Sequence, residues 1–194
     1  MSKISNLERI LRFLQSAEKL KTLLRHSWLS TGRQESVAEH SWRIALMVLL
    51  LEPELNIKID SVRALKISIV HDLAEVLAGD HHAWKGKLKN KHGIEKSALI
   101  KLLKNLPQPQ KKEIQKLWEE YEARKTEEAK LVKALDKLET IDQHNLADLS
   151  TWVKEEYTYN LVHGRKESKY NPILEKLREL INKATREKIK SSRQ

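Results

Sequence analysis

The chain has 194 residues, enough for one domain with a conventional hydrophobic core, and it contains no cysteine. Disulfides, thiolate metal sites and cysteine nucleophiles are therefore excluded, and any bound metal must use nitrogen and oxygen ligands. The net charge is +10, but lysines alternate with glutamates along the chain, which is typical of solvated helix faces and argues against a nucleic-acid-binding surface.

Apolar residues recur with a helical period throughout, and only five glycines and four prolines interrupt them. This predicts an all-α protein: a single domain over residues 1–194, with a core at about 5–180, six or seven helices and a disordered tail at 187–194. A polar loop is expected at 25–34 and an active-site-sized loop at 80–90. Helices are expected at about 5–24, from 36, 60–79, 91–104, 110–125, from 126, and from 172.

Two signals locate helix ends near polar side chains. Ser36 and Glu39 form an S-x-x-E capping box, which places His40 in the first turn of its helix. The helix from 60 carries His71 in its last two turns and is expected to end where Gly79 adopts a left-handed cap.

No apolar segment is long enough to cross a bilayer, since the longest strongly apolar run covers only residues 44–51. The N-terminus lacks the apolar block of a secretory signal. We therefore expect a cytoplasmic protein.

The chemistry is indicated by an adjacent His71-Asp72 pair within an apolar helical stretch. A carboxylate there is costly unless something neutralises it, and a metal would do so. With His40 and Asp136, the pair offers two imidazoles and two carboxylates to one divalent cation, with Mn, Co, Fe, Zn, Ni and Mg all open. Glu75, one turn after His71, is the candidate general acid or base.

This order of His, His-Asp and Asp resembles the HD-domain phosphohydrolases. The sequences around His40, at 71–80, at 117–122 and at 132–137 are similar to the 5'-deoxynucleotidase subfamily. The resemblance implies a helical homodimer that uses a divalent metal to cleave deoxyribonucleoside 5'-monophosphates. It also implies a catalytic role for Glu75.

Three substrate-binding residues follow from the same resemblance. Arg25 and Trp28 match an Arg-x-x-Trp element that contacts phosphate and nucleoside, although Trp28 lies about two residues closer to His40 than expected. Asp80 matches the carboxylate that reads the sugar and favours deoxyribose. Beyond it the chain departs from the subfamily in a His81-His-Ala-Trp84 segment, whose histidines are either further ligands or exposed loop residues.

Two alternatives remain open at this stage. The same centre could act on a deoxynucleoside triphosphate, because the altered 81–84 segment could enlarge the pocket. The basic charge would also suit a nucleotide- or nucleic-acid-binding module without catalysis. The leading hypothesis is a metal-dependent phosphomonoesterase with a small deoxynucleotide as its partner, bound to neither nucleic acid nor membrane.

Overall fold

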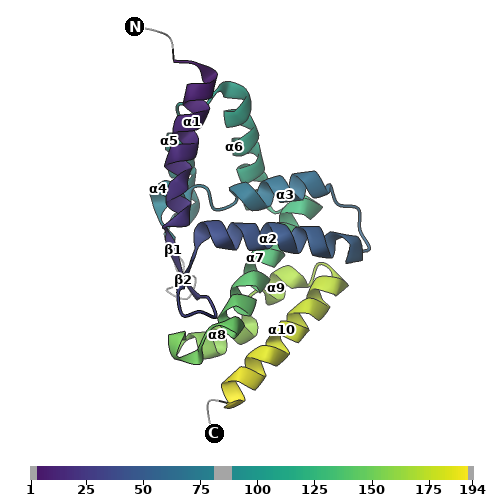
Figure 1. Cartoon of the computed structure of the whole chain (residues 1–194). Coiled ribbons are helices and arrows are strands. Elements are labelled where there is room, and N and C mark those ends of the chain that lie inside the picture. Colours follow the sequence, from purple (N-terminus) through teal and green to yellow (C-terminus); the bar gives the residue numbers. More distant parts are fainter. Residues whose placement is uncertain (1–3, 81–88, 192–194) are drawn as a thin grey trace.

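The computed structural model describes residues 4–80 and 89–191, and helices dominate that part of the chain (Figure 1). This confirms the predicted all-α fold. Within these described residues, short 3-10 helices lie at Glu18–Lys21, Glu52–Glu54 and Leu149–Thr151. The α-helices are α1 (Asn6–Ala17), α2 (Val37–Leu51), α3 (Ser61–Val70), α4 (Glu75–Ala78), α5 (Lys91–Leu102), α6 (Gln108–Ala123), α7 (Glu127–Leu146), α8 (Glu156–Val162), α9 (Arg165–Ser168) and α10 (Pro172–Ser191).

Side-chain caps fix where the main helices begin. Ser5 and Ser36 each form a reciprocal capping box with a glutamate three residues later, at the start of α1 and α2. Asp60 accepts a hydrogen bond from a backbone amide in the first turn of α3, and Thr126 does the same for α7. The caps predicted at Ser36 and Thr126 are therefore confirmed.

The predicted polar loop at 25–34 is wrong in part, because the chain forms an antiparallel hairpin there. Strand β1 (Leu24–Trp28) pairs with β2 (Gln34–Ser36), and a bulge interrupts their register. The short strands, with an irregular burial pattern, give no alternation of apolar and polar residues that would have predicted them.

Two further helices and one helix cap differ from the prediction. The helix expected over 60–79 is broken after Val70 and resumes as α4. It does end at Gly79, whose φ of 80° suits glycine, but ψ is 159° and so the cap is not left-handed helical. The C-terminal helix continues to Ser191, so residues 187–191 are helical where a disordered tail was expected.

Helix α7 is the centre of the fold. It packs against α2, α3, α6, α10 and β1, and Figure 1 shows it crossing behind α2. Its apolar side chains are buried on several faces, and the large side chains of Leu131, Leu135, Leu138 and Ile141 are among those with no exposed surface. A helix buried on several faces brings its polar residues into the interior too, and Asp136 and Glu139 are among them.

Within residues 4–80 and 89–191, no helix is long and apolar enough to span a membrane.

Candidate metal centre

The predicted metal ligands come from two segments that are distant in sequence and that both lie beside α7, and from α7 itself. The first turn of α2 supplies His40, the turn between α3 and α4 supplies His71 and Asp72, and α7 supplies Asp136. The Nε2 atom of His40 lies 3.5 Å from Oδ1 of Asp136 and 3.8 Å from Oδ2 of Asp72. That same Oδ2 lies 3.1 Å from Nε2 of His71. The structure thus brings His40, His71 and Asp72 within reach of one ion, and it places Asp136 beside His40.

The ligand atoms of His40, His71 and Asp72 all lie within 4.8 Å of one another, a spacing that fits one ion, and Asp136 contacts this group at His40. Ligands held about 2.1 Å from a common metal lie roughly 3–3.5 Å from one another. The Nε2 atoms of His40 and His71 are buried and have no hydrogen-bond partner among the described residues. Buried nitrogens that face two carboxylates without a hydrogen bond are the donors that a cation would satisfy.

The opposite nitrogen of each ring is held by a neighbour, which fixes the orientation. Nδ1 of His71 lies 2.8 Å from the carbonyl oxygen of Ser68, one turn earlier in α3. Nδ1 of His40 lies 2.5 Å from Oε2 of Glu139. A proton on each Nδ1 leaves the Nε2 lone pair directed at the shared centre, as in metal-binding histidines generally.

Asp136 is held so that only one oxygen faces the centre. Its Oδ2 accepts a hydrogen bond of 2.7 Å from the Tyr121 hydroxyl and contacts Nζ of Lys133 and Lys137 at 3.0 and 3.1 Å. Although burial raises its pKa, Lys137 and Lys133 outweigh that effect and hold the pKa well below its usual range. Asp136 is therefore an anion, with Oδ1 directed toward His40.

The carboxylates around His40 change the pKa of its imidazole. Burial and Arg25 lower its pKa, but Glu139 and Asp136 outweigh them and raise it to about 9. Without a metal the imidazole therefore carries a proton at neutral pH, which shows that the site favours a positive charge at this position.

Glu75 lies beside the proposed ligands, but the backbone that carries it is not the regular helix that the sequence predicted. After Val70 the hydrogen bonds shorten from four-residue to three-residue spacing, as in that from the Glu75 amide to the Asp72 carbonyl. His71, Asp72 and Glu75 therefore share a tight turn instead of one regular helix. Glu75 is 4% exposed, and its Oε2 has no hydrogen-bond partner among the described residues. Burial, then Asp72 and Asp80, raise its pKa well above the usual value.

Arg25 extends from β1 into the same region. Its Nη1 lies 3.7 Å from Oδ2 of Asp72, and its Nε lies 3.3 Å from Oε2 of Glu35. Burial opposes the charge, but Asp80 and Asp72 outweigh it and raise the pKa of the guanidinium. Arg25 and Asp80 are thus near the predicted ligands, where a guanidinium suits a phosphate.

The other predicted contacts are less closely tied to the centre. The ring of Trp28 packs edge-to-face on His26, and its carbonyl accepts a hydrogen bond of 2.6 Å from Gln143. Trp28 therefore contacts His26 and Gln143, and neither contact joins it to a proposed ligand. His81, His82 and Trp84 lie outside the described residues.

Glu139, Lys133 and Tyr121 were missed by the sequence analysis. Glu139 and Lys133 lie three residues after and before Asp136, so the helical period places them close to its face of α7. That signal was available. Tyr121 belongs to α6, and its contact depends on how two helices pack.

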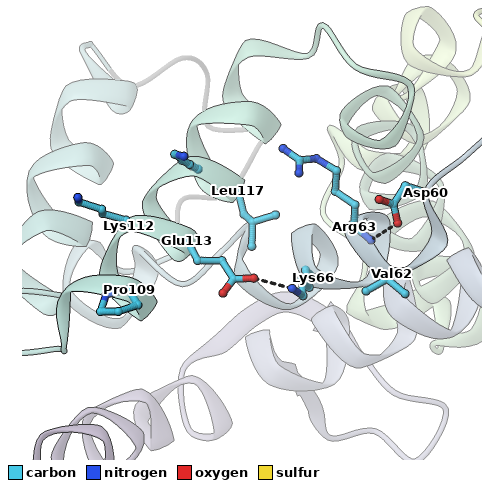
Figure 2. Close-up of a pocket in the computed structure, with 9 residues that line it drawn as sticks. Asp60, Val62, Arg63, Lys66, Pro109, Lys112, Glu113 and Leu117 are labelled. Atoms are coloured by element: carbon cyan, nitrogen blue, oxygen red, sulfur yellow. Dashed lines mark hydrogen bonds and ion pairs between the residues drawn. The ribbon is translucent and has the colours of Figure 1, made fainter. Parts of the chain in front are cut away.

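A hollow of about 400 Å³ between α3 and α6 is rich in basic residues (Figure 2). Two of the four cations that line it are paired: Lys66 lies 2.5 Å from Glu113, and Arg63 makes two hydrogen bonds to Glu120. Paired cations of this kind favour the solvated-surface interpretation of the net charge.

Residues 17–178 match the HD domain family. The chain belongs to this family. A 5'-deoxynucleotidase HDDC2 from Dictyostelium discoideum is 40% identical over 141 residues, which are 69% of this chain and 74% of the relative. The HDDC2 protein of Danio rerio is 37% identical over 71% of this chain and 68% of its own length. The 5'-deoxynucleotidase hdd1 of Schizosaccharomyces pombe is 35% identical over 80% of this chain and 85% of the relative.

Solved structures agree with this assignment to the HD domain family. A predicted metal-dependent phosphohydrolase from Magnetospirillum magnetotacticum has a TM-score of 0.73 and 30% identity, covering 94% of this chain and 97% of that one. A conserved hypothetical protein from Pyrococcus furiosus has a TM-score of 0.68 and 35% identity, covering 91% and 99%. The predicted resemblance is therefore confirmed, and a divalent metal is supported.

Proposed function

We propose that this chain is a metal-dependent 5'-deoxynucleotidase that hydrolyses deoxyribonucleoside 5'-monophosphates to a deoxynucleoside and inorganic phosphate. The observation that carries the proposal is the pair of buried, unbonded Nε2 atoms of His40 and His71 facing two carboxylates. The names of the relatives support the same substrate class.

His40, His71, Asp72 and Asp136 are the proposed ligands. A divalent cation held by them would polarise a phosphoryl group and make water more acidic. The donor set of two nitrogens and two oxygens suits Mn, Co, Fe, Zn, Ni or Mg. Metal analysis of the purified protein would decide among them.

The surrounding residues have complementary roles. Glu75, whose pKa is raised above its usual value by burial, would hold or release a proton during phosphoester cleavage. Arg25 would bind the phosphate, and Asp80 would contact the sugar and favour deoxyribose. Trp28 remains proposed as a nucleoside contact, since an indole suits a sugar or base face.

Phosphate release from deoxynucleoside monophosphates, measured with each metal in turn, tests the activity. Glu75→Gln should lower kcat by about 10²- to 10⁴-fold, which is the usual contribution of a general acid or base. Glu113→Gln is the matched control, because that exposed glutamate pairs with Lys66 outside the centre. Absence of release from the wild-type protein with every metal would refute the proposal.

The same assay separates the alternatives. Deoxynucleoside triphosphates should yield little product. Accumulation of nucleoside and triphosphate would identify a triphosphohydrolase instead. A non-catalytic binding module would release nothing from either substrate, and its affinity for DNA would fall steeply with salt.

Self-association and location are proposed on other grounds. We propose a homodimer because the exposed side of α2 carries only large apolar residues, Trp42, Leu46, Leu49 and Leu50, where a monomer would expose charges. Light scattering after size-exclusion chromatography tests this, and a single 22.7 kDa species would contradict it. A cytoplasmic location stays a prediction from the sequence.

A further inference from the structure

The contact between His40 and Glu139 joins the first turn of α2 to α7. Both side chains are fully buried, and Nδ1 of His40 lies 2.5 Å from Oε2 of Glu139. Since the two ring nitrogens face different ways, this contact directs Nε2 at Asp136 and Asp72. Glu139 touches His40 on the side opposite the metal centre and contacts none of the other proposed ligands in the described structure.

Glu139 is itself held in place. Its Oε1 lies 3.5 Å from Nη1 of Arg43, which follows His40 by three residues in α2. The same nitrogen of Arg43 donates a hydrogen bond of 2.5 Å to Gln143, one turn beyond Glu139 in α7. These contacts hold the carboxylate of Glu139 in place behind His40.

A second cation site is the alternative explanation for this cluster, because Glu35, His40 and Glu139 offer ligand atoms within 4.8 Å of one another. The separation of 2.5 Å between Nδ1 of His40 and Oε2 of Glu139 is too short for two atoms that share one metal, which lie roughly 3 Å apart or more. A proton shared between the two atoms accounts for this distance, so the contact is a charge-assisted hydrogen bond.

We propose that Glu139 is a positioning residue, which holds the His40 imidazole in the tautomer and orientation that leave Nε2 free for the metal. This inference rests on the proposed function, because it takes His40 as a ligand. Glu139 makes the ring a stronger donor and prevents it from rotating, as carboxylates behind metal-binding histidines do. It acts through His40 and does not contact the substrate.

The test is metal binding by Glu139→Gln, measured calorimetrically with Mn²⁺ on metal-free protein. The affinity should fall by about 10- to 100-fold, the usual effect of losing such a partner. Glu156→Gln is the matched control, because Glu156 is equally buried and contacts His144 but touches none of the proposed ligands. Its affinity for Mn²⁺ should equal that of the wild type.

The dependence of activity on metal concentration gives a second measurement. Raising Mn²⁺ should restore most of the kcat of Glu139→Gln, whereas the loss in Glu75→Gln should persist at any concentration. Wild-type affinity in folded Glu139→Gln would overturn the proposal and leave the nucleotidase activity standing. So would binding of two ions by the wild type and one by the variant, since that indicates a second cation site. A wild-type protein that binds Mn²⁺ but cleaves no nucleotide would refute the proposed function alone.

Discussion

Replacing Tyr121 with phenylalanine is expected to lower the free energy of unfolding by about 1.5–3 kcal/mol. The tyrosine is 2% exposed, and its hydroxyl donates a hydrogen bond of 2.7 Å to the ionised Asp136. Hydrogen bonds to charged groups contribute about that much. The ring packs in the apolar cluster with Leu117 and Leu135, and phenylalanine would fill the same space, so no cavity adds to the loss.

Tyr170→Phe is the matched control for this substitution. Tyr170 packs against the same cluster, but its buried hydroxyl has no hydrogen-bond partner among the described residues. Removing such a hydroxyl should leave the stability unchanged or raise it. Urea unfolding of metal-free protein measures both, through the midpoint at constant m-value. If Tyr121→Phe and Tyr170→Phe changed the free energy of unfolding by amounts that agree within about 0.5 kcal/mol, the assigned role of the Tyr121 hydroxyl would be refuted.

Three further predictions concern stability. Ser36→Ala should cost about 1 kcal/mol by removing the cap of α2, as thermal or urea unfolding would show. Burial and Glu139 raise the pKa of Glu35 to about 7, so the unfolded chain loses this proton first and stability should fall as the pH rises from about 4.5 to 7. The fall in the free energy of unfolding is at most about 3 kcal/mol in metal-free protein. Glu35→Gln should make it smaller. An unchanged pH profile in this variant would contradict the assignment to Glu35. Gly164→Ala should cost more than Gly32→Ala: both have positive φ, but a Cβ at Gly164 would lie 2.9 Å from Cβ of Lys137 and at Gly32 would meet nothing.

The sequence predicted most of the helices because their signals are local. The S-x-x-E box at Ser36 and the threonine at 126 act on backbone amides within three residues, so tertiary packing changes them little. The break after Val70 was not predictable in this way. The apolar period continues through the break, and only the hydrogen bonds of the folded turn reveal the change to three-residue spacing.

The sequence pointed to the proposed metal ligands for a different reason. An adjacent His71-Asp72 pair in an apolar stretch requires compensation, and few partners in the chain can supply it. For the residues that hold the proposed ligands, the sequence offers only the helical period that places Glu139 and Lys133 near the face of Asp136. A buried glutamate in α7 looks like any other charged helix residue until the packing of α2 against α7 places His40 behind it.

The hairpin explains why Arg25 is tied more closely to the centre than Trp28 is. Strand β2 leads directly into the cap of α2, and the amide of Val37 donates a hydrogen bond to the carbonyl of Leu23, so the start of β1 and the turn carrying His40 are joined. Arg25 lies at this joined end and contacts Glu35. Trp28 lies at the other end of β1, beyond the bulge and next to the connection between the strands. A change of two residues in that connection would displace Trp28 relative to His40 and leave Arg25 in place. The unexpected spacing therefore affects the position of Trp28 and not that of Arg25.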